Sequence, residues 1–318
     1  MTHDRKQHSG HLESSYRAAD TIMRERAVSF YGAFRFLPEA RFRSVTALYA
    51  FCRHADDLVD TVSGQDAGVY ALEKLDIIEK AVRALVAGDE MPAHDYPAWW
   101  PAFSETVIEY SVPLSSLLAQ LEGQRSDLDF QDLQTLDDLI NYGRLVAGSV
   151  GTMMVPLLVN EDVDSQNPNF IAACENLGIA MQITNILRDV GEDLRTRDRV
   201  YLPLDMLMRH GVSRRELKHL SLMPAGTDIT NHIPEGFTKI WEELATTADA
   251  LYREYLLMLS HFHPDCRLPL VMSQLTYQAI AEEIRRSGYN CLTIRNYTTN
   301  EQRLSLLNDA KELVAIYG

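Results

Sequence analysis

Two groups of carboxylate residues, far apart in the chain, have a spacing that suits metal binding. In the stretch 181–203 (MQITNILRDVGEDLRTRDRVYLP), Asn185, Asp189 and Asp193 recur at every fourth residue. Nothing before Pro203 breaks a helix, so these three side chains lie on one helical face. Stacked like charges destabilise a helix unless a cation compensates them, and donors that are all oxygen suit a hard ion such as Mg²⁺. Interleaved apolar residues indicate an inward-facing stripe rather than a solvated acidic surface.

The second group has the same character. In the stretch 47–60 (ALYAFCRHADDLVD), Asp56 and Asp60 are four residues apart, and Arg53 precedes Asp56 by one helical turn. Because helical bundles build ligand sites from facing helices, we expect the two stripes to face each other across a cavity. They would share metal ions that bind an anionic ligand. Replacing one of these aspartates by asparagine is then expected to stabilise the metal-free fold slightly.

The composition excludes some classes of protein. The net charge of −15 argues against a nucleic-acid partner, and an acidic protein needs metal ions to bind a polyanion. The sequence has neither a GxGxxG pattern nor a P-loop, so no tightly bound nucleotide is expected. The four cysteines show no metal-ligand spacing, which is typical of reduced thiols that pack in a core: Cys52, Cys174, Cys266 and Cys291.

The apolar pattern predicts an all-α protein. With 46% apolar residues, 16 Gly and 12 Pro, the chain suits a single helical domain over residues 12–318, preceded by a disordered tail at 1–11. The longest apolar stretch, near 150–159, is too short to cross a bilayer, so we expect a cytoplasmic protein. Residues 211–233 are predicted to be irregular. The predicted helices run from Leu12 toward Phe30, from near Pro38 to Ser63, and at about 69–87, 101–122, 134–150, 167–196, 234–262, 266–288 and 301–316.

The two acidic stretches resemble a known family. YAFCRHADDLVD (49–60) is similar to the first aspartate motif of the squalene/phytoene synthases, and NILRDVGED (185–193) followed by RVYLP (199–203) is similar to the second. Weaker similarity runs from about Ser29 to Arg295. The resemblance implies an isoprenoid-synthase-like helical bundle around a central cavity. It also implies a reaction in which two identical allylic prenyl diphosphates condense head to head through a cyclopropyl diphosphate.

The resemblance implies roles for individual residues. Two or three Mg²⁺ ions would be bound by the stripe residues Asp56, Asp60, Asn185, Asp189 and Asp193. The four aspartates and Tyr142 would be the catalytic residues. Tyr142 opens the pattern YGRLVAGSVG (142–151), and its ring and hydroxyl suit carbocation stabilisation and proton transfer. Contacts to the substrate are implied for Ser29, Tyr49, Arg53, Gln182, Arg188, Tyr277 and Arg295.

Three features leave alternatives open. The family's Ser-Lys-Ser-Phe appears here as AVSF (27–30), so a basic contact is missing, for which Arg26 is a candidate substitute. The late Tyr-x5-Arg pattern fits Tyr289 to Arg295 with a register ambiguous by one residue, which leaves Ile294 and Arg295 as alternatives. Thr46 lies about 15 Å along the helix axis from Asp56, where a prenyl tail would point, and Phe34 is a second candidate for the floor of that tunnel.

Among the products that the resemblance implies, we expect phytoene from geranylgeranyl diphosphate. The alternatives are dehydrosqualene or squalene from farnesyl diphosphate, a terpene cyclase of similar architecture, and a non-catalytic relative that acts as an assembly factor. The intact second motif argues against the last two. No NADPH and no obligate protein partner are expected. Peripheral membrane contact, which would serve release of an apolar product, stays open.

Overall fold

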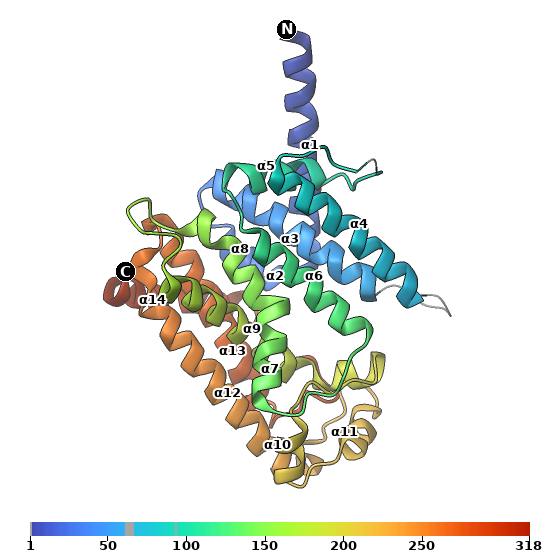
Figure 1. Ribbon diagram of the computed structural model, residues 1–318. Helices are drawn as coiled ribbons and strands as arrows, with labels where there is room; N and C mark the ends of the chain where they lie inside the picture. Colours follow the sequence, from blue (N-terminus) through green and yellow to red (C-terminus); the bar gives the residue numbers. More distant parts are fainter. Residues whose placement is uncertain (1, 61–66, 93) are drawn as a thin grey trace. The chain divides into compact units, whose positions relative to one another are not determined.

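The computed structural model describes residues 2–60, 67–92 and 94–318, and among them the side chains of 10–59, 68–92 and 94–318. Over these residues it has helices and one isolated antiparallel bridge, between Val159 and Phe262, but no strand (Figure 1). The all-α prediction is therefore confirmed. The chain forms two compact units, and each consists of three separate stretches of sequence.

The first unit comprises Met1–Phe130, Ser149–Ile171 and His261–Leu270. In this unit α3 (Glu39–Asp60), which carries the first acidic motif, is the central helix. It contacts α1 (Thr2–Arg26), α4 (Ala67–Ala87), α5 (Trp100–Glu109), α6 (Leu114–Leu128) and α8 (Ser149–Leu158). The short α2 (Val28–Phe34) precedes it.

Small and aromatic side chains explain the central place of α3. Ala47, Ala50 and Ala55 are fully buried, which lets neighbouring helices approach closely. Phe51 stacks on Phe103 of α5 with ring centroids 4.7 Å apart and planes 11° apart. The first motif therefore sits on a helix that is packed on several sides.

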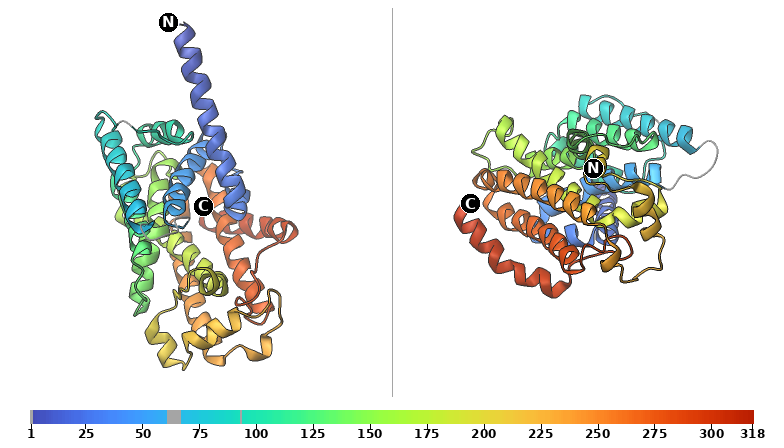
Figure 2. Two further views of the ribbon diagram at one scale, coloured as in Figure 1. Left: turned by 90° about the vertical axis from the view of Figure 1, so that its right-hand side faces the viewer. Right: turned by 90° about the horizontal axis from the view of Figure 1, so that it is seen from below.

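The second unit comprises Gln131–Gly148, Ala172–Ser260 and Val271–Gly318. Its main helices are α9 (Pro168–Thr196), α12 (Glu235–Leu256), α13 (Pro264–Arg286) and α14 (Asn300–Tyr317); the first residues of α9 and α13 belong to the first unit. Trp241 of α12 donates its indole N–H to the Leu187 carbonyl of α9 (3.3 Å). Gln302 of α14 donates to Glu283 of α13 (2.6 Å), and the two helices lie side by side (Figure 2). The shorter elements are α7 (Leu136–Gly143), the π-helix η1 (Arg144–Gly148), α10 (Leu204–Arg209), α11 (Arg214–Ser221), η2 (Thr230–His232) and η3 (Leu259–His261).

Several predicted segments differ from the structure, and one of them is the predicted helix over 101–122, which is divided into α5 and α6. The predicted helix over 134–150 is interrupted by the π-helix η1, which directly follows the segment that carries Tyr142. The predicted irregular segment 211–233 contains α11, which begins at the cap residue Ser213: its hydroxyl accepts the Glu216 N–H (3.1 Å). The Ser-x-x-Glu capping pattern was present in the sequence and indicates this helix start.

The N-terminal segment is helical in the structure, because α1 begins at Thr2. Its first turns extend beyond the other helices of the first unit (Figure 2). Residues 2–11 contain no apolar side chain, so their sequence offers no hydrophobic surface to stabilise this part of the helix. The disordered tail and the single-domain organisation of 12–318 stay predictions.

One helix in the described part of the chain, α9, is long and apolar enough to cross a membrane by length and composition. However, 61% of its most apolar window is buried inside the protein. Buried core helices of globular proteins pass the same test, and α9 also carries the second acidic motif.

Candidate active site

The first acidic motif contacts a glutamine that spacing arguments do not identify. Asp56 Oδ1 accepts a hydrogen bond from Gln124 Nε2 of α6 at 2.5 Å, and Gln124 is buried. A single glutamine in an otherwise ordinary helix gives no sequence signal, so only packing reveals this contact. Asp60 is the last residue of α3, and its side chain lies outside the described ones.

Arg53, a predicted diphosphate contact, is paired with the acid beside the predicted ligand. Its guanidinium forms an ion pair with Asp57, four residues later on α3, and Arg26 Nη2 lies 3.8 Å from the same Asp57 carboxylate. The Arg53 Nε atom is buried and has no hydrogen-bond partner among the described residues. An unpaired buried N–H is costly, so this donor suits an anionic ligand. The ion pair also brings Arg26, the candidate for the missing basic contact, to the first motif.

The predicted tunnel residues lie on α2 and α3. The Phe30 ring is 4.2 Å from the Phe34 ring and 6.3 Å from the Tyr49 ring, measured between centroids. Phe34 and Thr46 are buried, and the Thr46 hydroxyl donates to the Arg43 carbonyl at 2.7 Å. Ser29 is a half-buried residue of α2. The contact of these residues with a substrate stays a prediction.

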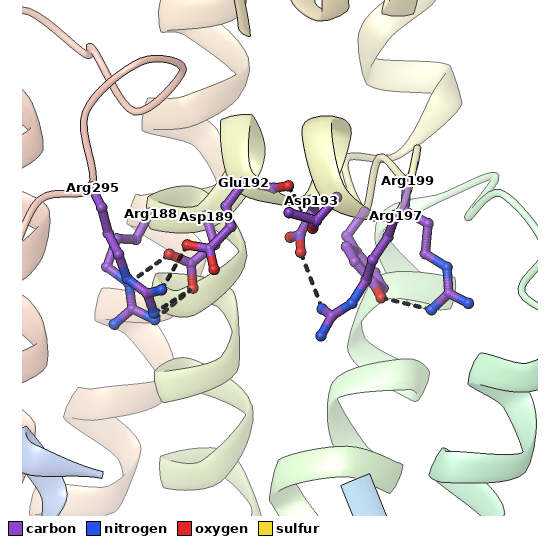
Figure 3. Close-up of polar contacts among 9 residues, drawn as sticks. Arg188, Asp189, Glu192, Asp193, Arg197, Arg199 and Arg295 are labelled. Atoms are coloured by element: carbon purple, nitrogen blue, oxygen red, sulfur yellow. Dashed lines mark hydrogen bonds and ion pairs between the residues drawn. The ribbon is translucent and has the colours of Figure 1, made fainter. Parts of the chain in front are cut away.

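The second motif surrounds Asp189 with two guanidinium groups. Arg188 donates from Nε and Nη2 to the two Asp189 oxygens at 2.8 and 2.5 Å, a bidentate pair. Both side chains are largely buried, with exposed fractions of 15% and 17%. Arg295 comes from the loop after α13, and its Nη2 lies 3.6 Å from Asp189 Oδ2 (Figure 3). Of the alternatives Ile294 and Arg295, it is therefore Arg295 whose side chain reaches the motif.

Asp193 ends the stripe in a different environment. It is buried, and its Oδ1 accepts from Arg197 Nη1 at 3.3 Å. Its backbone carbonyl accepts the N–H groups of Arg197 (3.0 Å) and Arg199 (3.2 Å), which fixes its position at the end of α9. Burial, together with the neighbouring Asp189 charge, raises the pKa of Asp193 to about 7. A cation beside it would stabilise the charged form.

Gln182, Asn185 and Tyr277 form a second small cluster. Asn185 Nδ2 lies 3.4 Å from Gln182 Oε1, one turn earlier on α9. A side-chain hydrogen bond joins Asn185 to Tyr277 of α13. Burial raises the pKa of Tyr277, an effect that the nearby Arg188 charge opposes. Tyr277 is therefore a neutral phenol next to the predicted metal ligand.

Tyr142 lies against a tyrosine of the second motif. Its ring stacks on Tyr201 with centroids 5.2 Å apart and planes 30° apart, and Arg199 Nη1 lies 3.3 Å from the Tyr201 hydroxyl. Tyr201 was not singled out from the sequence, although it stands in the RVYLP segment that carries the resemblance. The pair brings two phenols and one arginine to the end of α9.

The donor set fits a hard divalent cation. Among the described side chains, no group of three or more His, Cys, Asp or Glu residues is arranged to hold a metal ion. Asn185 would not count in such a group, and Asp60 is not among the described side chains. The second motif offers amide and carboxylate oxygens only, and the raised pKa of Asp193 comes first from its burial and then from the neighbouring Asp189 charge. These donors suit Mg²⁺ rather than a softer metal.

Comparisons with known proteins agree with this geometry. The squalene/phytoene synthase family profile matches residues 23–304. The phytoene synthase of Thermus thermophilus is 34% identical over 302 residues, which cover 94% of this chain and 93% of that protein. A chloroplastic phytoene synthase of an Oncidium hybrid cultivar is 32% identical over 92% of this chain and 66% of its own length.

A solved structure gives the same result for the fold. The crystal structure of a dehydrosqualene synthase in complex with a ligand superposes with a TM-score of 0.81 at 30% sequence identity, and the match covers 96% of this chain and 98% of that one. The family profile alone spans most of the chain, including both acidic motifs. The chain therefore belongs to the squalene/phytoene synthase family of prenyltransferases, which condense prenyl diphosphates head to head.

Proposed function

We propose that this chain is a Mg²⁺-dependent phytoene synthase that joins two molecules of geranylgeranyl diphosphate. The observation that carries the proposal is the second motif, where amide and carboxylate oxygens stand on one face of α9 and two arginines pair with Asp189. Curated relatives named phytoene synthase, at 34% and 32% identity, support the choice of product.

Asp56, Asp60, Asn185, Asp189 and Asp193 would hold the metal ions. When bound, Mg²⁺ would neutralise the leaving diphosphate as the allylic C–O bond ionises. Arg53, Arg188 and Arg295 would donate hydrogen bonds to diphosphate oxygens, and the unpaired Arg53 Nε supports this role. Gln182 and Tyr277 would orient Asn185.

The remaining residues would act on the hydrocarbon. The allylic cation would be captured by the double bond of the second substrate, which gives the cyclopropyl diphosphate. A second ionisation, rearrangement and loss of a proton would complete the reaction without a reductant. Tyr142, stacked on Tyr201, would present a ring face to a cation and a hydroxyl to a proton. The apolar product and the buried α9 suit a cytoplasmic enzyme that meets the membrane only at its surface.

A second candidate is a dehydrosqualene synthase, which would use farnesyl diphosphate. The structural match to a dehydrosqualene synthase at 30% identity favours it. The two candidates differ in the length of the prenyl tail, and the buried Thr46 and Phe34 are the residues through which the chain would set that length.

Incubation with Mg²⁺ and either farnesyl or geranylgeranyl diphosphate, with and without NADPH, tests the proposal. We expect phytoene from geranylgeranyl diphosphate, equal yields with and without NADPH, and no turnover after chelation of Mg²⁺. Hydrocarbon from farnesyl diphosphate alone would favour the second candidate. Squalene that forms only when NADPH is supplied would overturn both.

A further inference from the structure

The loop after α13 is anchored to α12 by hydrogen bonds at its start. Gly288 and Tyr289 have positive φ angles of 65° and 62°, which turn the chain sharply at the end of the helix. The Tyr289 hydroxyl then donates to Glu242 of α12 at 2.8 Å, and Arg285 binds the same carboxylate through Nε and Nη2, both at 2.8 Å. The start of the loop is therefore fixed to α12.

The middle of the loop is fixed by Asn290, which is 1% exposed. Its Nδ2 donates to the Thr227 carbonyl at 3.0 Å, and its Oδ1 accepts the Thr293 N–H at 3.1 Å. Asn296 Nδ2 donates back to the Asn290 carbonyl at 3.1 Å. A segment whose buried asparagine is hydrogen-bonded through both its amide nitrogen and its oxygen has one preferred conformation at that point. Arg295, which lies between Thr293 and Asn296, is therefore held on a rigid support.

This loop touches α9 inside the second motif. The Gly191 N–H donates to the Cys291 carbonyl at 3.1 Å. A Cβ atom at Gly191 would lie 2.1 Å from the Leu292 carbonyl oxygen, closer than real Cβ atoms approach. Gly191 stands midway between Asp189 and Asp193, so the absence of a side chain there lets the loop backbone lie against the motif.

Glu192 then fixes the end of the Arg295 side chain. Arg295 Nη1 donates to Glu192 Oε2 at 2.6 Å, and its Nη2 is the atom 3.6 Å from Asp189 (Figure 3). Arg295 is 56% exposed, so burial does not hold its guanidinium in place. A long exposed side chain loses rotamer freedom only where a partner fixes it. Glu192 supplies that partner.

We propose that Glu192 and Gly191 are positioning residues for Arg295: Glu192 holds its guanidinium beside Asp189, and Gly191 admits the loop that carries it. This inference rests on the proposed diphosphate site at Asp189. Glu192 is thereby distinguished from the neighbouring acids, because it acts on an arginine and not on the metal ion. Although Glu192 is negatively charged, it would favour the binding of an anion, because it holds Arg295 in place.

Two explanations of the contact between Glu192 and Arg295 predict opposite changes in anion binding, so an experiment can distinguish them. If Glu192 only adds negative charge near the diphosphate, Glu192→Ala will strengthen binding of an anion. If it positions Arg295, the same change will weaken that binding. Alanine favours a helix, and Glu192 is partly exposed, so the variant should fold.

The experiment measures binding of inorganic pyrophosphate in the presence of Mg²⁺ by titration calorimetry, for Glu192→Ala, Arg295→Ala and the double variant. We expect each single change to weaken binding by about tenfold, and the double variant to bind no more weakly than Arg295→Ala. Glu243→Ala is the matched control: it also removes a glutamate that pairs with an arginine, Arg209, at 2.7 Å on a helix of the same unit. It should bind pyrophosphate like the parent protein.

Other results would overturn the inference. Tighter binding by Glu192→Ala, or effects of the two single changes that add in the double variant, would show that Glu192 does not act through Arg295. Weaker binding of Mg²⁺ alone by Glu192→Ala would make Glu192 a metal ligand instead. If the parent protein itself binds no pyrophosphate in the presence of Mg²⁺, the proposed function fails as well. If the parent protein binds pyrophosphate but the losses in the two single variants add in the double variant, only this inference fails.

Gly191→Ala supplies a second test. The added methyl group must displace the loop, so pyrophosphate binding should weaken, with no additional effect when Arg295 is already alanine. Gly236→Ala is the steric control, because its Cβ would lie 2.2 Å from the His210 carbonyl oxygen and not against the loop after α13. It should lower the unfolding temperature but leave pyrophosphate binding unchanged. Equal loss of binding in both glycine variants would overturn the role of Gly191.

Discussion

Asp56 and Gln124 are joined by a hydrogen bond of 2.5 Å that links the first acidic motif on α3 to α6. The amide is a neutral donor, so it orients the carboxylate without neutralising it. A carboxylate that stays charged and oriented is what a bound Mg²⁺ ion requires. The two acids next to each other in the motif thus differ in their partners, because Asp57 binds arginines.

Asp56→Asn should therefore abolish turnover and leave the fold intact. The change keeps the side-chain volume and an oxygen acceptor for Gln124 but removes the charge that binds the metal ion. We expect a loss of at least about a hundredfold in kcat, measured as hydrocarbon formed at limiting Mg²⁺. The unfolding temperature should stay close to that of the parent protein. Parent-like activity under these conditions would contradict the role of Asp56.

Asp189→Asn should abolish turnover and also destabilise the protein. Acid spacing alone predicts slight stabilisation, since repulsion between the aspartates is relieved. The structure changes the expected sign, because Asp189 accepts two hydrogen bonds from the largely buried Arg188. We expect a loss of about 1–3 kcal/mol in the free energy of unfolding, measured by urea denaturation without metal. Asp198→Asn, at an exposed ion pair, is the control and should leave the free energy of unfolding close to that of the parent protein.

The stability of the second unit should depend on pH through Glu242. Arg285 and Tyr289 donate hydrogen bonds to its carboxylate and hold its pKa below the ordinary value of 4.5. A lowered folded-state pKa contributes stability above pH 4.5, and this contribution is lost as the pH falls through the folded-state pKa. Glu242→Gln should cost about 1 kcal/mol at pH 7, because the pair is partly solvent-exposed. The difference between variant and parent should shrink from pH 5 to pH 3. Urea denaturation measures the free energy of unfolding across this range. A constant difference between Glu242→Gln and the parent protein would refute the role of the Glu242 carboxylate.

Tyr142→Phe should slow the reaction after the first condensation. The variant keeps the ring that stacks on Tyr201 but loses the hydroxyl that could move a proton. We expect the cyclopropyl intermediate to accumulate among the products, detected by mass spectrometry after removal of the diphosphate. NADPH should not restore the rate. An unchanged rate and product profile would show that the Tyr142 hydroxyl takes no part.

Thr46→Trp tests the control of product length. Thr46 is 1% exposed, so an indole at this position must occupy space that a prenyl tail would need or displace neighbouring helices. We expect the C40 product from geranylgeranyl diphosphate to be lost and a C30 product from farnesyl diphosphate to be retained. Ser44→Trp, at another buried position of α3, is the control for overpacking and should leave the product ratio unchanged. An unchanged ratio in Thr46→Trp would place Thr46 outside the tunnel.

The helical class and the residues of the two motifs could be predicted from the amino-acid pattern alone. A spacing of four residues puts Asn185, Asp189 and Asp193 on one face, because the helical period depends only on backbone geometry. The apolar residues between them indicated that this face points inward, and the structure places Asp193 among buried residues. That the two motifs face each other stays a prediction from the sequence.

The partner of each charged side chain could not be predicted and became clear from the folded chain. Asp189 pairs with its neighbour Arg188 and with Arg295, and Glu192 binds the same Arg295 across 103 residues of sequence. Gln124 reaches Asp56, and Tyr201 reaches Tyr142, in the same way, through contacts between distant segments. The reason is physical: a local pattern fixes the direction of a side chain relative to its own helix. What lies opposite depends on how closely other segments can pack, and at Gly191 that distance is set by a missing side chain.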